Sequence, residues 1–381
     1  MRVALNVEQL LYRSPGGVGR YTAQLATLLP ANGGDEVVAF TARHSRAEVS
    51  AAMARFGVPG PPATILGLPR PVLYEAWHRF GRPPLAVGDV DVIHAPSVTV
   101  PPRRATPLVV TVHDAASALF PEAFTRRGLH FHRLGLAAAA RRADLVITVS
   151  QTAAAEIVDH SAIGSERIRV VANGVDPVTI DPAAAAAARA RLGVADRPYV
   201  LWVGSLEPRK NVRTLVAAVA VLARRLGNGV PGRPRLVLAG YPGWLSDDLI
   251  DPADRAALGD DLVQLGILAE DDLWALYAGA ELLGFPSRHE GFGYPVLEAM
   301  TQGIPVVCSD IAVLREVGGP AARYVAATDV GAWADAMDGL LADPRQRQAA
   351  ALAGRAWAAR FAVANSVAAT RAVYGEVTGS S

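Results

Sequence analysis

Two adjacent cations, Arg209 and Lys210, could bind an anion, and Lys210 is the only lysine among 37 basic residues. The apolar segment Tyr199–Val203 predicts a buried strand, and Asn211 precedes an apolar-periodic run to Leu226 that predicts a capped helix. Free backbone N–H groups and the helix dipole favour an anion at such a strand-to-helix turn. Lysine reaches a phosphate as a compact charge, whereas the guanidinium is wide and planar. We therefore expect a phosphate site; the alternative is a lysine retained by chance on a solvated loop.

A second segment could bind a polyhydroxylated ligand. Leu282–Phe285 predicts another buried strand, and the residues after it contain Glu290, Gly291 and Gly293 before a helix that includes Glu298. Glycines let the backbone approach a ligand closely, with N–H groups directed at it. Carboxylates accept hydrogen bonds from sugar hydroxyls, so a polyhydroxylated ligand is favoured over a metal. The alternative is an ordinary helix start, at which a glutamate interacts favourably with the helix dipole and binds no ligand.

The elements that would position these residues alternate between strands and helices, which predicts an α/β fold with doubly wound parallel sheets. The predicted strands are 3–6, 37–41, 92–94, 108–112, 145–149 and 168–171, then 199–203, 236–239, 262–265, 282–285 and 305–308. Two Rossmann-like domains are expected, residues 1–178 and 179–354. A C-terminal helix within 355–381 is expected to pack back toward the first domain. Ligands should bind in a cleft between the carboxyl ends of the two sheets.

The composition excludes several classes of protein. A length of 381 residues, 51% apolar and 19% charged, suits two globular domains, and the net charge of +1 argues against nucleic acid as the main partner. Cys308 is the only cysteine, so no disulfide framework is expected and a reducing cytosol is the simplest setting. The first residues lack the pattern of a signal peptide, and no apolar run reaches the length of a membrane span. We expect a cytoplasmic protein, with any membrane contact peripheral and at the inner face.

Several motifs together resemble glycosyltransferase family four, a group of retaining enzymes with the GT-B fold. The first motif is the pair Glu290 and Glu298, separated by seven residues that include Gly291-Phe292-Gly293. The second is Gly204 followed by Pro208-Arg209-Lys210-Asn211. Further matching segments are Ser14-Pro15-Gly16-Gly17-Val18-Gly19, Thr111-Val112-His113-Asp114, Val171-Ala172-Asn173-Gly174 and Gly303-Ile304-Pro305. The resemblance covers nearly the whole chain and is densest from residue 199 to residue 319. Many members carry an arginine where this chain has Ser205, so the diphosphate site would depend more on Arg209 and Lys210.

The resemblance implies that residues 1–178 form the acceptor-side domain and residues 179–354 the nucleotide-sugar-binding domain. It also implies a role for each matching residue. The catalytic residues would be Arg209 and Lys210 on the donor diphosphate, Glu290 on the donor sugar, and His113, reaching the sugar across the cleft. The donor-binding residues would be Glu298 on the ribose, Gly291, Phe292 and Gly293 through their backbone, Gly16 and Gly17 in a close-approaching loop, and Ile267 and Leu268 near the base.

The resemblance implies transfer of a hexose-type sugar from a nucleoside-diphosphate sugar to a glycan, glycolipid or small-molecule acceptor, with retention of configuration. A mannosyl- or rhamnosyl-type donor is weakly favoured. No cofactor is expected, and no group of Asp or His has metal-ligand spacing, so no metal is required. The alternatives are another GT-B enzyme, such as a phosphorylase or a nucleotide-sugar epimerase, and a non-catalytic nucleotide-sugar-binding subunit.

Other polar residues have simpler interpretations. His130 and His132 are two residues apart and would not share a helix face, so we do not expect a metal there. We expect His94 to belong to the core or to a cleft wall. The segment 126–142, which contains His130 and His132, is rich in arginine, at Arg126, Arg127, Arg133, Arg141 and Arg142. A solvated helix face is the favoured explanation, and a surface for anionic membrane or a lipid-diphosphate acceptor is the other.

Overall fold

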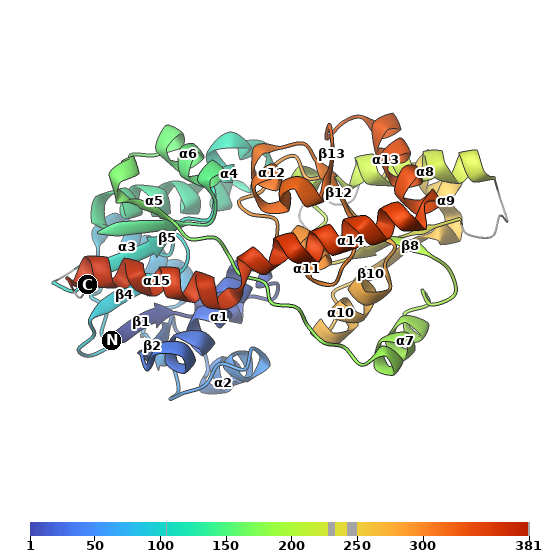
Figure 1. Ribbon diagram of the computed structural model, residues 1–381. Coiled ribbons are helices and arrows are strands. Elements are labelled where there is room, and N and C mark those ends of the chain that lie inside the picture. The colour runs from blue at the N-terminus through green and yellow to red at the C-terminus, as the bar shows by residue number, and fades with distance from the viewer. Residues whose placement is uncertain (104, 228–232, 242–249, 380–381) are drawn as a thin grey trace. The chain divides into compact units, whose positions relative to one another are not determined.

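The structure is a computed structural model that describes residues 1–103, 105–227, 233–241 and 250–379 (Figure 1). It divides into two compact units: unit 1 is Met1–Gly174 with Val363–Ser381, and unit 2 is Val175–Ala362. The sequence analysis placed these divisions after residues 178 and 354, whereas the chain changes unit after Gly174 and again after Ala362. Residues 380 and 381 of the predicted C-terminal segment lie outside the described residues.

Unit 1 is built on a parallel sheet, which among the described residues has seven strands in the order β3-β2-β1-β4-β5-β6-β7. The strands are β1 (Arg2–Asn6), β2 (Glu36–Thr41), β3 (Thr64–Ile65), β4 (Val92–Ala95), β5 (Leu108–Thr111), β6 (Leu145–Thr148) and β7 (Ile168–Val170). Every adjacent pair is parallel, as in β1 and β4, where Val3 pairs with Val92. The order reverses between β1 and β4, and such a switch point is where α/β sheets bind ligands.

Helices cover both faces of the first sheet. They are α1 (Gly16–Gly33), α2 (Arg46–Arg55), α3 (Arg70–Phe80), α4 (Ala116–Leu119), α5 (Arg126–Arg142), α6 (Gln151–His160) and α15 (Val363–Thr378), with the 3₁₀ turns η1 (Glu8–Leu11), η2 (Pro121–Ala123) and η3 (Ser165–Arg167). Successive residues of a strand face opposite sides. Leu5 therefore joins a core cluster with Leu25 of α1, whereas Ala4 joins one with Trp77 of α3 and Ala138 of α5.

The C-terminal helix α15 belongs to unit 1 although it follows unit 2 in the sequence (Figure 1). It packs against α1, and its Tyr374 is fully buried. The Tyr374 hydroxyl lies 2.6 Å from Nδ1 of His94, and Nε2 of His94 lies 2.8 Å from the hydroxyl of Thr111. His94 is therefore a satisfied core residue that joins β4, β5 and α15, which agrees with its interpretation from the sequence.

Unit 1 should lose stability in mild acid because of His94. Burial, and to a smaller extent the neighbouring His113, lowers the pKa of His94 from 6.5 to about 3. Below pH 6.5 the unfolded chain binds a proton that the folded chain does not, so stability falls as the pH drops toward 3. Between pH 6.5 and pH 5 the loss from this group should be about 2 kcal/mol. Urea unfolding at pH 7 and at pH 5 measures it.

The matched variant for this prediction is His94→Gln, which should make the unfolding free energy less sensitive to that pH change. His130→Gln is the control, because the side chain of His130 is 47% exposed. Equal pH dependence in the wild type and His94→Gln would contradict the prediction.

Unit 2 is built on a second parallel sheet, which in the described part of the chain has six strands in the order β10-β9-β8-β11-β12-β13. The strands are β8 (Tyr199–Val203), β9 (Arg235–Ala239), β10 (Leu262–Gly266), β11 (Leu282–Phe285), β12 (Val306–Ser309) and β13 (Arg323–Val325). The order reverses between β8 and β11, which pair directly through Leu282 and Val200. The two segments that the sequence analysis singled out follow these two strands.

The helices of unit 2 end with one that includes the first residues of the predicted C-terminal segment. They are α7 (Pro182–Arg191), α8 (Val212–Leu226), α9 (Pro252–Leu258), α10 (Glu270–Gly279), α11 (Tyr294–Thr301), α12 (Ala312–Gly318), α13 (Val330–Ala342) and α14 (Pro344–Ala358), with 3₁₀ turns η4 (Pro208–Lys210), η5 (Gly259–Asp261), η6 (Gly319–Ala321) and η7 (Ala359–Phe361). The predicted C-terminal helix begins later than expected, because residues 355–358 still belong to α14 and α15 begins at Val363. The chain leaves α14 through η7, where the carbonyl of Phe361 accepts a hydrogen bond from the Val175 backbone.

Candidate active site

The segment after β8 is fixed to the segment after β11 by hydrogen bonds. The Arg288 backbone N–H donates to the carbonyl of Arg209, and the side-chain amide of Asn211 donates to the carbonyls of Pro286 and Ala327. Asn211 has a left-handed backbone (φ 53°) and makes no side-chain cap hydrogen bond, so its predicted capping role is wrong. Its side chain joins the loops instead, which places Arg209 and Lys210 beside Glu290.

The two cations converge on the carboxylate of Glu290. Nζ of Lys210 donates to Oε1 of Glu290 at 2.6 Å, and NH1 of Arg209 lies 3.5 Å from Oε2. Lys210 also lies over the ring of Phe285, 5.5 Å from its centroid. Arg209 donates to the carbonyl of His289 at 2.7 Å and to the carboxylate of Glu207 at 2.8 Å. Lys210 is thus neither solvated nor alone, so the alternative of a solvated loop position is wrong.

These charges are partly buried, which strengthens their interaction. The side chains of Arg209, Lys210 and Glu290 are only 16%, 13% and 8% exposed. Burial alone would raise the pKa of the Glu290 carboxyl, but the charges of Lys210 and Arg209 outweigh it and hold the pKa below its usual value. Glu290 is therefore ionised at neutral pH. With Glu207, the two cations and two carboxylates make a site with no net formal charge.

This site lies at the switch point of the second sheet, because Lys210 follows β8 and Glu290 follows β11. The carboxyl ends of parallel strands at a switch point form the usual ligand crevice of such sheets. The sequence analysis therefore predicted the position of the cations correctly, but not their mutual pairing with Glu290. It also missed Glu207, a carboxylate that is 2% exposed and orients Arg209. Its position in the Glu-Pro-Arg-Lys segment was the available signal.

In the segment before α11, the fold itself requires a glycine at position 293. Gly293 has a φ of 105°, and a Cβ there would lie 2.7 Å from the side chain of Leu314. Phe292 is 5% exposed and packs edge-on against Tyr294 and Phe361. The side chain of Phe292 is therefore part of the core, and Gly291 and Gly293 are buried beside it.

Glu298 lies within α11, where a hydroxyl group positions it. The carboxylate is 4% exposed, and the Tyr277 hydroxyl of α10 donates to its Oε2 at 2.6 Å. Tyr277 is a second residue that the sequence analysis did not identify. Its pairing with Glu298 joins two helices across 21 positions of the chain, and a single sequence carries no signal for it.

Replacing Tyr277 with phenylalanine should weaken this positioning without removing the packed ring. We expect nucleoside-diphosphate affinity to fall several-fold, because a typical hydrogen bond contributes about 0.5–1.5 kcal/mol. Calorimetric titration with a nucleoside diphosphate and its 2′-deoxy analogue measures this. If Glu298 binds the ribose, the variant should discriminate less between the two ligands; unchanged discrimination would contradict that role.

A pocket of about 250 Å³ lies at the ends of β8, β9 and β10. It is lined by Trp202, Leu206, Leu238, Gly240, Gln264 and Gly266. A Cβ on Gly240 would lie 1.7 Å from the carbonyl oxygen of Gly204, so glycine is required where these loops meet. Ile267, directly after the pocket, is 54% exposed, and Leu268 is half-buried. The segment predicted to lie near the base thus borders an open pocket of unit 2.

The remaining predicted residues lie in unit 1. His113 follows β5, with Nε2 placed 2.9 Å from the carbonyl of Pro96 and its ring edge-on to Tyr21 at 5.2 Å. Burial lowers the pKa of His113, so the imidazole is neutral at pH 7. Gly16 begins α1 with a φ of 58°, and Gly17 is exposed beside it. The structure therefore brings Arg209, Lys210 and Glu290 together, and places His113, Gly16 and Gly17 in the other unit.

Both histidines and two of the arginines in the segment 126–142 interact with groups of the protein itself. In the described part of the chain no three His, Cys, Asp or Glu side chains are grouped in a way that could hold a metal ion. His130 lies 3.2 Å from Glu75, and His132 packs edge-on against Phe124. Arg141 and Arg142 bind carbonyls at the end of α3, so two of the five arginines of this region are structural.

Comparisons with known proteins agree with this geometry. The family model described as Glycosyl transferases group 1 matches residues 186–357, and the model Glycosyltransferase Family 4 matches residues 15–179. O-antigen chain mannosyltransferase B of Escherichia coli is 32% identical over 302 residues, which cover 78% of each chain. The chain belongs to glycosyltransferase family 4. The family predicted from the sequence is confirmed, and with it transfer of a sugar as the general activity.

Relatives of this family 4 glycosyltransferase include proteins with different named substrates. D-inositol 3-phosphate glycosyltransferase of Salinispora arenicola is 32% identical over 292 residues, covering 72% of this chain but only 64% of that protein. Among solved structures, Anabaena HepE in complex with UDP and glucose has a TM-score of 0.74 at 20% identity, covering 99% of this chain and all of that one. WaaG, a glycosyltransferase involved in lipopolysaccharide biosynthesis, has a TM-score of 0.68 at 18% identity, covering 99% and 100%. The predicted GT-B fold with two Rossmann-like domains is confirmed.

None of the described helices of this glycosyltransferase combines the length and the apolar character needed to cross a membrane.

Proposed function

We propose that this family 4 glycosyltransferase moves a hexose-type sugar, with the mannosyl type favoured, from a nucleoside-diphosphate sugar to a glycan or lipid-linked acceptor. The observation that supports this most is the convergence of Arg209 and Lys210 on Glu290 at the switch point of the second sheet. The first named relative, an O-antigen chain mannosyltransferase, supports the sugar and the glycan acceptor. HepE, solved with UDP and glucose, supports a nucleoside-diphosphate donor.

The chemistry follows from the change in charge as the donor reacts. Breaking the bond between the sugar C1 and the phosphate oxygen leaves additional negative charge on the diphosphate. Arg209 and Lys210 stabilise that charge as it develops, because donors already in place have little reorganisation to complete. Glu290 holds Lys210 at 2.6 Å, so the ammonium is fixed at the carboxyl ends of β8 and β11. These two cations supply the positive charge for which other transferases use a metal ion.

Retention of configuration is the second part of the proposal. The acceptor hydroxyl would attack C1 on the same face of the sugar from which the phosphate leaves. Its proton would pass to the departing phosphate oxygen. This route needs no carboxylate as a base on the opposite face. Glu290 would then contact the donor sugar, Glu298 the ribose, and the pocket beside Ile267 the base.

Transfer assays test the proposal directly. The purified protein would be incubated with GDP-mannose, UDP-glucose and dTDP-rhamnose, each with a panel of mannosides as acceptors, in parallel reactions that contain either EDTA or Mg²⁺. We expect one donor to be consumed faster when an acceptor is added, and we expect the new linkage to have the anomeric configuration of the donor in the NMR spectrum. A product of inverted configuration would contradict retention, and activity abolished by EDTA would contradict metal independence. Absence of donor consumption would contradict the proposed activity.

A further inference from the structure

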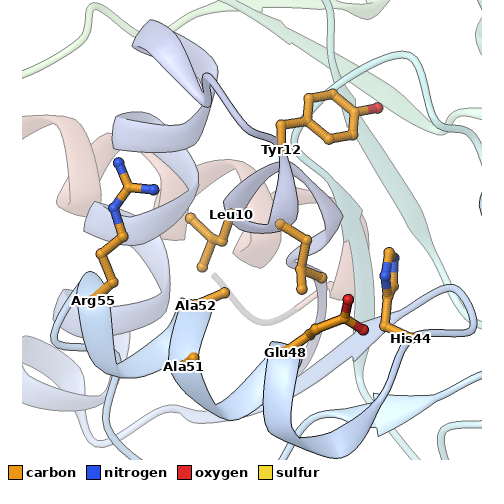
Figure 2. A pocket seen from close by; sticks show the side chains of 8 residues that line it. Leu10, Tyr12, His44, Glu48, Ala51, Ala52 and Arg55 are labelled. Atoms are coloured by element: carbon orange, nitrogen blue, oxygen red, sulfur yellow. The ribbon is translucent and has the colours of Figure 1, made fainter. Parts of the chain in front are cut away.

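Unit 1 contains a pocket of about 340 Å³ between η1 and α2, away from the residues discussed so far (Figure 2). Its volume is within the range of small-molecule sites in proteins, roughly 300–1,000 Å³. One wall is formed by Leu10 and Tyr12, and the other by side chains of α2. Nothing in the proposed donor chemistry uses these residues, so the pocket needs a separate explanation.

The pocket has an apolar middle and polar ends. Figure 2 shows Arg55 at one end and Glu48 beside His44 at the other, with Leu10 and Ala51 between them. The two ends carry opposite charges, so the pocket is poorly suited to a strongly charged ligand. A sugar ring has an apolar C–H surface surrounded by hydroxyls, and those hydroxyls both donate to carboxylates and accept from guanidinium groups.

A buried carboxylate holds the polar end in place. Glu8 is 2% exposed, and its Oε1 lies 2.8 Å from Nε2 of His44. Its Oε2 accepts hydrogen bonds from the hydroxyl of Thr41 at 2.5 Å and from the Ala42 backbone at 2.9 Å. Burying a carboxylate is costly unless it is hydrogen-bonded. Here the buried group fixes the imidazole that lines the pocket, as expected of a site whose polar contacts must be preorganised.

The pocket also lies at the edge of the sheet where ligands bind. η1 follows β1 and His44 follows β2, so both walls begin at carboxyl ends of parallel strands. The side chain of Gln9 in η1 donates to the carbonyl of Pro15 at 3.4 Å. That contact joins the turn to the start of α1, where Gly16 and Gly17 lie. The turn that forms one wall of the pocket is therefore fixed to the start of the glycine loop.

We infer that this pocket binds a sugar ring of the acceptor, with Arg55 and His44 as its polar contacts. The inference rests on the proposed transfer of a sugar to a glycan acceptor. A glycan supplies a neutral ring with hydroxyls on its rim, which matches the polar ends, and an apolar face, which matches Leu10 and Ala51.

The test compares two tryptophans on the same helix. Ala51 and Ala54 are both exposed on α2, but only Ala51 lines the pocket. Saturation-transfer NMR would be recorded with methyl α-D-mannopyranoside as the probe on the wild type, Ala51→Trp and Ala54→Trp. Arg55→Gln is a further variant, because it removes the charge at one end without filling the space.

We expect the probe signal to fall at least threefold in Ala51→Trp and in Arg55→Gln, and to stay at the wild-type level in Ala54→Trp. Equal signals in the wild type and Ala51→Trp would overturn the inference, and so would the absence of any signal with the wild type. Circular dichroism would verify that the variants fold. Donor cleavage by the unaltered protein tests the proposed function separately, so a protein that cleaves donor but binds the probe equally in all variants would overturn only the acceptor pocket.

Discussion

Replacing Lys210 with alanine is expected to slow sugar transfer at least tenfold. The ammonium lies 2.6 Å from Glu290 at a switch point, where the proposed diphosphate would replace the carboxylate as its partner. A hydrogen bond to a charged group contributes roughly 1.5–3 kcal/mol, and each 1.36 kcal/mol in the barrier changes the rate about tenfold. Lys210→Ala also leaves Glu290 facing Arg209 alone at 3.5 Å. The turnover number with saturating donor measures the effect.

The matched control is Arg213→Ala, which removes a cation that is 68% exposed and only three residues away. Its turnover should stay within about twofold of the wild type, because exposed ion pairs contribute little. Lys210→Arg should restore only part of the activity, since the planar guanidinium cannot take the place of a compact ammonium. Turnover of Lys210→Ala equal to that of the wild type would contradict the assignment of this site.

Replacing Glu290 with glutamine should change binding and turnover in opposite directions. The carboxylate is ionised and offsets part of the positive charge of Lys210 and Arg209. Without its charge only Glu207 still offsets the two cations, so a nucleoside diphosphate should bind about tenfold more tightly, which corresponds to about 1.4 kcal/mol. Sugar transfer should nevertheless fall at least tenfold, because the donor sugar loses a charge-assisted contact.

Asp335→Asn is the control for the glutamine variant, because it removes a carboxylate that is 69% exposed in the same unit. Calorimetry would give the affinity for the nucleoside diphosphate, and the transfer assay would give the turnover number. A Glu290→Gln variant that binds the nucleotide more weakly and also turns over more slowly would contradict the prediction. It would show that the carboxylate stabilises the binding site and does not repel the phosphate.

Most strands of both sheets could be predicted because their apolar runs are long enough to stand out. The two strands that were missed, β3 (Thr64–Ile65) and β13 (Arg323–Val325), are short and lie at sheet edges. The break between α14 and α15 was missed for another reason. The alanine-rich sequence favours continuous helix, and the chain turns at η7, where Phe361 accepts a hydrogen bond from Val175, a residue distant in sequence.

From the residues alone the candidate site could be predicted only as two separate segments, and the family resemblance assigned both to one donor without predicting their direct contact. The residue types and the helix starts indicated an anion at Lys210 and a hydroxylated ligand at Glu290. The pairing of these two residues spans 80 positions, and that of Tyr277 with Glu298 spans 21. Such contacts depend on the order of the strands, which places β8 beside β11. A single sequence does not specify which segments become neighbours, so the role of Glu290 as the partner of Lys210 required the structure.

The central claim, that Arg209 and Lys210 bind the donor diphosphate, is tested most directly by calorimetric titration in EDTA. The wild type and Lys210→Ala would each be titrated with a nucleoside diphosphate and with the corresponding monophosphate. We expect the wild type to bind the diphosphate at least tenfold more tightly than the monophosphate, and we expect Lys210→Ala to lose most of that preference. Equal affinities for the two nucleotides in the wild type, or an undiminished preference in Lys210→Ala, would contradict the claim.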